Sequence, residues 1–313
     1  MTPSKLDLER ASSRISDTVR KTPLQRSDFL SERWDADVYL KCEQFQEIGA
    51  FKIRGAANFA LQLSEEERSK GLVTHSSGNH AQAVACLASR LGMKADIVMP
   101  ENSNKVKIAN AEKWGAQIHF CAPTIAARKE MAIAIQKEKG SIMIPPFDHE
   151  WIVEGQSTCA MEIISERDVD VLVAPLGGGG LLAGTALAAH YFGKDVDVIG
   201  TEPDQASDGY RGFMSGEREE DVTSNTVADG LRTSVGQVPF GIIREHVKDI
   251  KLAKESSILP WMFETWKYEK LIIEPSCAVP FAALDQDPSV LKGKRVAIII
   301  TGGNVDLNQF VAS

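Results

Sequence analysis

Short apolar runs rich in branched residues alternate with longer segments of helical periodicity along most of the 313-residue chain. Runs of this kind predict strands. They cover residues 38–42, 72–75, 95–99, 117–120, 141–144, 169–174, 196–200 and 295–300. Two of the helical segments between them, residues 82–91 and 105–114, end at a glycine, which is common at helix C-termini. The alternation predicts an α/β fold with mainly parallel sheets flanked by helices.

The strands within residues 72–144 follow one another in a compact succession of strand–helix units. This succession predicts a small domain over residues 66–147. Residues 1–65 and 148–313 would then form a larger, discontinuous domain, because a chain of this length favours two lobes over one.

The composition limits the partners and the compartment. A net charge of −8 disfavours binding to nucleic acid or to an anionic membrane surface. The apolar runs are too short to span a bilayer, and the N-terminus lacks the apolar core of a signal peptide. The five cysteines are widely spaced and form no CxxC pair, so we expect free thiols in a reducing cytoplasm.

Four consecutive glycines stand at a predicted strand–helix junction: Gly177, Gly178, Gly179 and Gly180. Such a stretch is entropically costly in a packed domain unless the backbone must close around a ligand. Bare amides at the positive end of a helix are typical of a phosphate-binding loop. An ordinary tight turn would need fewer glycines, and the spacing does not match the GxGxxG pattern of dinucleotide sites.

A lysine at the start of a predicted helix is the first candidate for chemistry. Lys52 lies between Phe51 and Ile53, so partial burial and the positive helix end would both lower its pKa. A neutral amine can form an imine, although many lysines of this kind only cover apolar surface. Together with a phosphate loop, such a lysine would suit a cofactor that carries an aldehyde and a phosphate.

Two polar segments follow predicted strands. Residues 76–80, with the sequence Ser-Ser-Gly-Asn-His, offer hydroxyl, amide and backbone N–H groups to a carboxylate, or form a helix cap and turn. Thr301 follows the strand at 295–300, where ligands dock in open α/β sheets. It is either an ordinary strand end or a neutral partner for a ring nitrogen.

Six segments in this order resemble those of the fold type II enzymes that use pyridoxal 5′-phosphate (PLP), specifically the serine/threonine dehydratases and serine racemases. The matching segments are residues 51–56, 76–80, 177–180, 228–230, 273–276 and 301–304. The resemblance implies a two-lobed fold similar to the tryptophan synthase β subunit, with a mobile small domain and PLP in the cleft. It also implies a homodimer that acts on an amino acid.

The resemblance assigns a role to each candidate residue. Lys52 would bind the cofactor aldehyde covalently and act in catalysis, and Phe51 would lie against the ring. Asn79 would contact the ring 3-hydroxyl, Thr301 would face the ring nitrogen, and the four glycines would wrap the phosphate. The substrate carboxylate would contact Ser76, Ser77, Asn79 and His80, and Ser77 would also move a proton on the face opposite the lysine. Arg128 matches a family arginine near the pocket.

A metal site is also implied. In the cation-dependent members of the family, Mg²⁺ or Ca²⁺ is bound by two acids and a backbone carbonyl, which match Glu202, Asp208 and Ala206. The other interpretation is a loop with two solvated acids. Two departures from the family pattern are Ala81, where many members have glycine, and residues 277–280, which replace a more glycine-rich segment close to the expected cofactor wall.

The predicted reaction is β-elimination of water from L-serine or L-threonine, which gives a 2-oxo acid and ammonia. Serine racemisation is the first alternative, and both reactions share the loss of the α-proton. Dehydration of 3-hydroxyaspartate is another, because Arg128 could meet a second carboxylate unless it is a solvated helix residue. A non-catalytic sensor of a phosphate-bearing ligand is the alternative from a different class. His80 disfavours a β-replacement enzyme of the cysteine synthase type.

Overall fold

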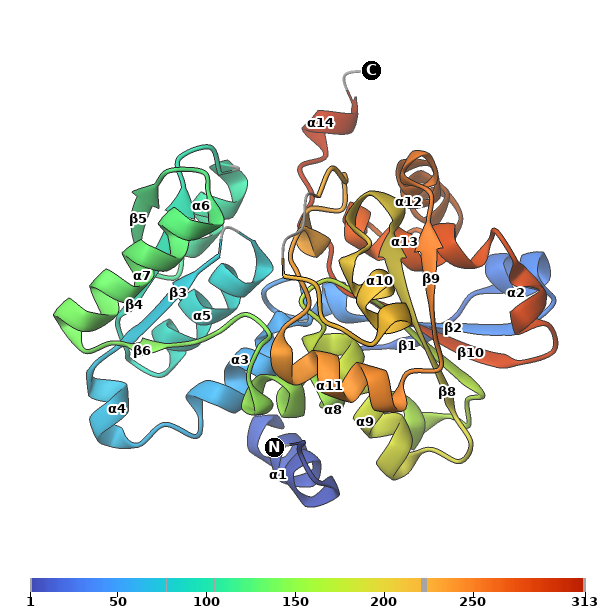
Figure 1. Cartoon of the computed structure of the whole chain (residues 1–313), viewed down its shortest axis with the longest axis horizontal. Coiled ribbons are helices and arrows are strands. Elements are labelled where there is room, and N and C mark those ends of the chain that lie inside the picture. Colours follow the sequence, from blue (N-terminus) through green and yellow to red (C-terminus); the bar gives the residue numbers. More distant parts are fainter. Residues whose placement is uncertain (1, 77, 104, 221–223, 312–313) are drawn as a thin grey trace.

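Two β-sheets form the framework of the protein, whose computed structural model describes residues 2–76, 78–103, 105–220 and 224–311 (Figure 1). The larger sheet has the strand order β1-β2-β10-β7-β8-β9, and all of its neighbouring strands are parallel except β1 and β2. Its strands are β1 (Leu24–Arg26), β2 (Asp37–Cys42), β7 (Val171–Pro175), β8 (Asp197–Pro203), β9 (Asp249–Ala253) and β10 (Arg295–Ile300). Both ends of the chain therefore build one sheet.

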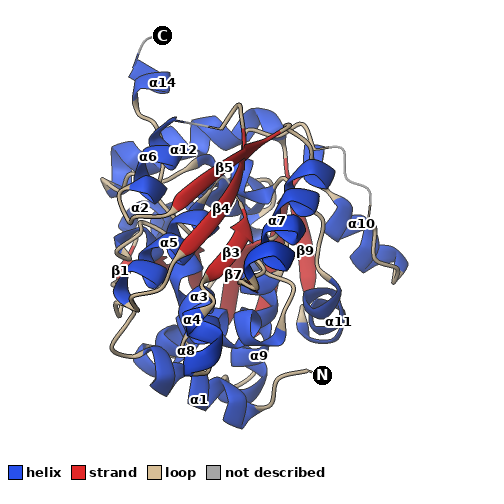
Figure 2. Ribbon diagram, turned by 90° about the vertical axis from the view of Figure 1, so that its left-hand side faces the viewer, coloured by secondary structure: helices blue, strands red, loops and turns tan. Residues whose placement is uncertain are grey.

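The smaller sheet comes from a single stretch of the chain and has the parallel order β5-β4-β3-β6. Its strands are β3 (Leu72–His75), β4 (Ala95–Pro100), β5 (Gln117–Cys121) and β6 (Ile142–Met143). Its helices are α4 (Glu65–Ser69), α5 (Asn79–Arg90), α6 (Lys105–Glu112) and α7 (Ile125–Lys139). Figure 2 looks onto this sheet, with α5 and α7 on opposite sides. Along β4, Ile97 packs toward α5 and Val98 toward α7, as the alternation of a strand requires.

The other helices come before or after this stretch of the chain. They are α1 (Lys5–Ile15), α2 (Asp28–Trp34), α3 (Lys52–Ala60), α8 (Glu150–Glu166), α9 (Gly180–Phe192), α10 (Asp208–Ser215), α11 (Gln237–His246), α12 (Glu255–Glu269), α13 (Pro275–Leu284) and α14 (Asn308–Val311). Along β10, Ile298 belongs to the apolar cluster under α12 and α13, and Ile299 to the cluster under α8 and α9. Both faces of the central strands are buried, which explains why their sequences are apolar throughout.

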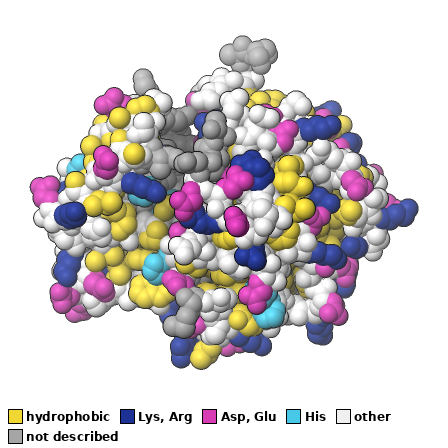
Figure 3. Space-filling view, in the orientation of Figure 1, with side chains coloured by type: hydrophobic (Ala, Val, Ile, Leu, Met, Phe, Trp, Pro, Cys, Tyr) yellow, Lys and Arg dark blue, Asp and Glu magenta, His cyan; other side chains and the backbone are white. Residues whose placement is uncertain are grey.

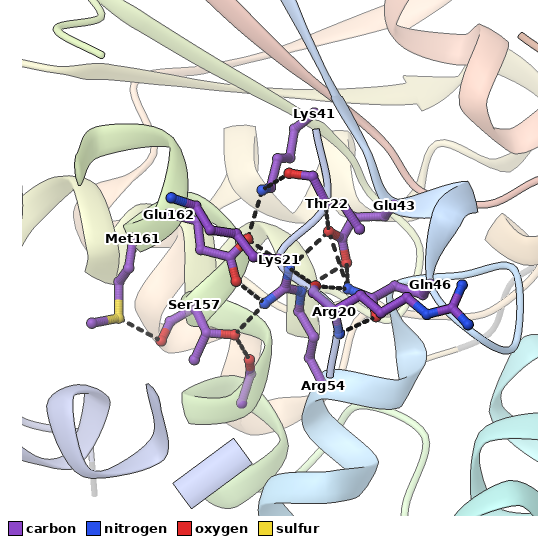
Figure 4. A network of polar contacts seen from close by, with 12 residues as sticks. Arg20, Lys21, Thr22, Lys41, Glu43, Gln46, Arg54, Ser157, Met161 and Glu162 are labelled. Carbon is purple, nitrogen blue, oxygen red and sulfur yellow. Dashed lines mark hydrogen bonds and ion pairs between the residues drawn. The ribbon is translucent and has the colours of Figure 1, made fainter. Parts of the chain in front are cut away.

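A buried ionic network holds the start of α3 (Figure 4). The guanidinium of Arg54 donates two hydrogen bonds to the Glu43 carboxylate, at 2.7 and 2.9 Å, and another of 2.7 Å to Glu162 on α8. Lys41 on β2 donates to the second oxygen of Glu162 at 2.6 Å. Arg54, Glu43 and Lys41 are all fully buried. The network therefore fixes α3, which contacts both α5 and α8, relative to the larger sheet.

The predicted fold class is confirmed, and each predicted strand is present with its ends shifted by no more than a few residues. The sequence did not predict β1 and β9, which are the edge strands of the larger sheet. Edge strands carry polar residues, such as Lys251 in β9, and lack a continuous apolar run. The domain boundaries proposed from the sequence stay predictions. In the described ranges, every helix is too short or too polar to cross a bilayer.

Candidate active site

A cavity of about 560 Å³ lies where strands of both sheets end. It is lined by His75 at the end of β3, Pro100 at the end of β4, Pro175 at the end of β7 and Thr301 just after β10. Ligands of open parallel sheets bind at this carboxyl edge. On the molecular face in Figure 3, Lys and Arg side chains are interspersed with Asp and Glu. Because it lies at the carboxyl ends of strands from both sheets, the cavity is the candidate active site.

Lys52 is the first residue of α3 and reaches into this cavity. Its Nζ donates a hydrogen bond of 2.9 Å to the carbonyl oxygen of Pro146 and lies 5.1 Å from the ring centroid of Phe51. Burial lowers the pKa of Lys52 to about 8, against the opposing effect of the Glu274 carboxylate. A large fraction of the amine is therefore neutral near pH 8, as a nucleophile for an aldehyde must be.

The four glycines connect β7 to α9 and line the same cavity as Lys52. A Cβ atom on Gly178 would lie only 2.1 Å from the ring of Phe147. Gly179 has a φ of +87°, and a Cβ there would meet Pro239 at 2.8 Å. The loop is thus closed in by its neighbours, and its bare amides lead into the N-terminus of α9. Backbone amides in this arrangement, in the wall of the cavity, suit a phosphate group.

Asn79, the first residue of α5, is held in one orientation by two neighbours. Its Oδ1 accepts a hydrogen bond of 2.8 Å from Nδ2 of Asn304, and its Nδ2 donates one of 2.8 Å to Glu274. An amide nitrogen has two protons, so the second proton can serve a ligand hydroxyl in the cavity. Reasoning from sequence found Asn79 but assigned no role to Glu274 or Asn304, although both lie in segments that resemble those of the family.

The rest of the 76–80 loop also lines the cavity, except that Ser77 lies outside the described residues. His80 donates from Nε2 to the carbonyl oxygen of Ile144 at 3.1 Å, because a carbonyl can only accept. Burial, together with the charge of Lys52, lowers the pKa of His80 to about 3. His80 is therefore neutral at physiological pH, and because Nε2 carries its one ring proton, Nδ1 can only accept a hydrogen bond. His75, which the sequence analysis did not select, lines the same wall.

Arg128 on α7 brings a cation to the small-sheet side of the cavity. Its Nε is buried and has no hydrogen-bond partner among the described residues. An unpaired buried N–H costs free energy, so this site favours an anionic ligand. Lys129 lines the cavity beside it, and both charges, after burial, lower the pKa of His75. The structure therefore brings Arg128 together with Lys52 and the glycine loop.

The three residues of the implied cation site lie outside the cavity lining. The Glu202 carboxylate accepts the backbone N–H groups of Gly209 and Tyr210, and Asp208 accepts that of Val235 at 3.2 Å. Both acids are buried, so the interpretation as solvated loop acids is wrong. The second oxygen of Asp208 is buried without a hydrogen-bond partner in the described chain.

Both acids have pKa values that are shifted toward the protonated form. Burial, followed by the charge of Asp208, raises the pKa of Glu202 well above its usual range, and burial raises the pKa of Asp208 to about 6. Two acid side chains and the Ala206 carbonyl would give a hard cation oxygen ligands. Within the described ranges, no group of three or more His, Cys, Asp or Glu side chains could bind a metal by themselves.

Comparison with known proteins agrees with this geometry. Residues 15–302 match the family described as pyridoxal-phosphate dependent enzyme. The chain is 38% identical over 308 residues to the beta-hydroxyaspartate dehydratase of Paracoccus denitrificans, covering 98% of each chain. Its structure is similar to that of serine racemase from Dictyostelium discoideum, with a TM-score of 0.91, 39% identity, and 96% and 98% of the two chains covered. A threonine deaminase from T.th. also matches, with a TM-score of 0.91, 38% identity, and 97% and 99% coverage.

The chain belongs to the pyridoxal-phosphate dependent enzymes, and its fold is that of the type II members. Its relatives are serine racemases, threonine deaminases and hydroxyaspartate dehydratases, as the motifs predicted. The protein is therefore a PLP-dependent enzyme, and a sensor without catalytic activity is no longer an alternative.

Proposed function

We propose that this enzyme eliminates water from a β-hydroxy amino acid and releases a 2-oxo acid and ammonia. The observation that carries the proposal is the placement of Lys52 and the glycine loop in one cavity of about 560 Å³, although they are more than 120 residues apart in sequence. PLP needs an amine for its aldehyde and donors for its phosphate, and this cavity offers both. L-Serine and L-threonine are the predicted substrates, with 3-hydroxyaspartate as a further candidate.

Each residue of the site would have its own role in this reaction. Lys52 would hold the cofactor and, once displaced by the substrate amine, accept the α-proton at Nζ. The Pro146 carbonyl would then accept a hydrogen bond from the charged amine. Asn79 would donate to the ring hydroxyl, and the hydroxyl of Ser76 and the backbone N–H of His80 in the first turn of α5 would donate to the substrate carboxylate. Bound PLP supplies an electron sink for the electron pair left on the α-carbon.

A substrate panel tests the proposal. The loaded enzyme is incubated with L- and D-serine, L-threonine and the stereoisomers of 3-hydroxyaspartate, and 2-oxo acid, ammonia and the enantiomer of the remaining substrate are measured. We expect equal amounts of oxo acid and ammonia from at least one hydroxy amino acid. Absence of oxo acid from the whole panel would contradict elimination, and inversion of L-serine without oxo acid would favour a racemase, in line with the similarity to serine racemase.

Arg128 favours 3-hydroxyaspartate as the second candidate substrate, because its buried Nε has no partner in the described chain and suits a second carboxylate. We expect Arg128→Met to lower kcat/KM for 3-hydroxyaspartate by about 10- to 100-fold, the size of one or two lost charge-assisted hydrogen bonds. The same variant should change kcat/KM for L-serine by no more than about threefold, because L-serine has no second carboxylate. Equal losses for the two substrates would contradict this role. Lys129→Met, which removes the neighbouring cavity cation, is the control.

We also propose that Glu202, Asp208 and the carbonyl of Ala206 bind Mg²⁺ or Ca²⁺. Adding either cation to chelator-treated enzyme should raise its melting temperature at pH 7.5 and raise it less at pH 5. The sign follows from the raised pKa of Asp208: below about pH 6 the carboxyl binds a proton in place of the cation. Glu202→Ala should abolish the response, whereas Glu219→Gln, an exposed acid paired with Arg211, should retain it. A cation response that survives in Glu202→Ala would contradict the site.

We further propose a cytoplasmic homodimer with a small domain, residues 66–147, that moves as a unit. Partly exposed Phe263, Tyr268 and Ile272 on and after α12 offer apolar surface for a second copy. The five cysteines are all buried and unpaired, as in proteins of a reducing compartment. Light scattering of the purified protein tests the dimer, and localisation of a tagged protein tests the compartment. A monomer at micromolar concentration would contradict the first of these proposals.

A further inference from the structure

Cys277 lies beside Thr301 in the wall of the cavity. It is on α13, the helix that packs against β7 to β10, whereas Thr301 follows β10. Its Sγ is 3.0 Å from Oγ1 of Thr301. Cys277 is completely buried and Thr301 is only 4% exposed, with its exposed part lining the cavity. Cys277 is therefore in direct contact with the hydroxyl of a residue that lines the cavity.

The hydrogen bonds around the sulfur limit where its single proton can point. Sγ accepts the backbone N–H of Gly302 at 3.1 Å and lies 3.0 Å from the carbonyl oxygen of the same residue. That carbonyl already accepts the backbone N–H of Glu274 at 3.1 Å. In the described chain, Sγ is the hydrogen-bond partner of Oγ1 of Thr301. The S–H therefore has two acceptors within reach, the Gly302 carbonyl oxygen and Oγ1 of Thr301, and only the carbonyl oxygen has another hydrogen-bond donor in the described chain.

We propose that Cys277 is a positioning residue: its S–H donates to Oγ1 of Thr301, so the hydroxyl proton of Thr301 points into the cavity, toward the pyridine nitrogen of bound PLP. A hydroxyl has one proton and two acceptor sites, so accepting from the thiol leaves its proton for the ligand. The inference rests on the proposed function for the placement of the ring at Thr301.

The thiol can fill this role across the physiological pH range. Burial raises the pKa of Cys277 to about 12, so the sulfur retains its proton. A neutral hydroxyl that donates to the ring nitrogen favours the unprotonated nitrogen. The N–H of a protonated ring nitrogen would face the O–H of Thr301, and two donors cannot form a hydrogen bond with each other. Less electron density is then withdrawn into the ring. Rapid loss of the β-hydroxyl is thereby favoured over long-lived carbanion chemistry such as transamination.

The test uses the holoenzyme loaded with PLP labelled with ¹⁵N at the ring, without substrate. The variants are Cys277→Ser, Cys277→Ala, Thr301→Val and the double variant of the last two. We expect Cys277→Ser, which keeps a donor, to retain the wild-type nitrogen chemical shift and PLP affinity. Cys277→Ala and Thr301→Val should move the nitrogen signal in the same direction and weaken PLP binding by about five- to tenfold each, the size of one net hydrogen bond. The double variant should bind PLP about as well as either single one, because both remove one interaction.

Wild-type nitrogen shift and affinity in Cys277→Ala would overturn the proposal, and so would losses that add in the double variant. Melting of the cofactor-free variants shows whether Cys277→Ala folds. If it does not fold, infrared spectroscopy replaces this variant. The S–H band of Cys277 is identified as the band that is absent from Cys277→Ser, and its position is then compared between wild type and Thr301→Val. The proposal requires this band to shift in Thr301→Val, and an unshifted band overturns it. The proposed elimination would be contradicted by a different result, namely that the loaded wild-type enzyme forms no oxo acid.

Discussion

Lys52→Ala is expected to lower oxo-acid formation by about 10³-fold or more, because it removes both the covalent attachment of PLP and the base for the α-proton. The amine is in the position that these roles require: it is the first residue of α3, within the cavity that the glycine loop also lines. The assay measures 2-oxo acid from the substrate that wild-type enzyme turns over fastest. Lys129→Ala, a second lysine of the same cavity, is the matched control and should retain most of the activity. Turnover near the wild-type rate in Lys52→Ala would overturn the catalytic role.

The lowered pKa of Lys52 gives the same residue a second, independent signature. As the pH rises toward 8, the rate of covalent capture of PLP by the apoenzyme should increase about tenfold per pH unit, and above pH 8 it should level off. The reason is that only the neutral amine attacks the aldehyde. A lysine with an ordinary pKa would continue to gain rate up to about pH 10. Stopped-flow absorbance of the bound cofactor between pH 6 and 10 measures this profile, and a rate that still rises above about pH 9.5 would contradict the expected burial effect.

Arg54→Met has the largest expected effect on stability, with a loss of about 3–5 kcal/mol in the free energy of unfolding. The substitution leaves the fully buried carboxylate of Glu43 without the guanidinium that donates two hydrogen bonds to it. Burial opposes ionisation of Glu43, yet Arg54 lowers its pKa below the ordinary value. The stabilisation by the pair is therefore present at neutral pH and is lost as the pH falls through the lowered pKa of Glu43.

Thermal unfolding of the apoenzyme measures this loss, with Arg211→Met as the control. Arg211 pairs with Glu219 on the surface, so its removal should cost no more than about 1 kcal/mol. Because Arg54 lies two residues after Lys52 on α3, the Arg54 variant should also bind PLP more weakly at temperatures where it stays folded. Equal melting temperatures for Arg54→Met and wild type would show that the network in Figure 4 contributes no net stability.

Much of the fold could be predicted because both faces of the central strands are buried. Such strands are continuously apolar, as at β10, and stand out from the amphipathic helices around them. The edge strands β1 and β9 have no such pattern and could not be found in this way. The order of strands in the larger sheet also could not be predicted from the sequence pattern, because β2 pairs with β10, which lies more than 250 residues later in the chain.

By itself, the sequence determined the chemical types at the site: an amine at the start of a helix, four adjacent glycines after a strand, and a hydroxyl at the end of another strand. These residue types can be identified from the sequence because each stands next to a helix end or a strand end, and such ends are recognised from neighbouring residues. Only the tertiary structure decided what surrounds them, namely the Pro146 carbonyl at Lys52, the ring of Phe147 against Gly178 and the thiol of Cys277 at Thr301. Those partners come from distant parts of the chain, and their effects on pKa and hydrogen bonding depend on burial, which exists only after the two sheets and their helices have packed.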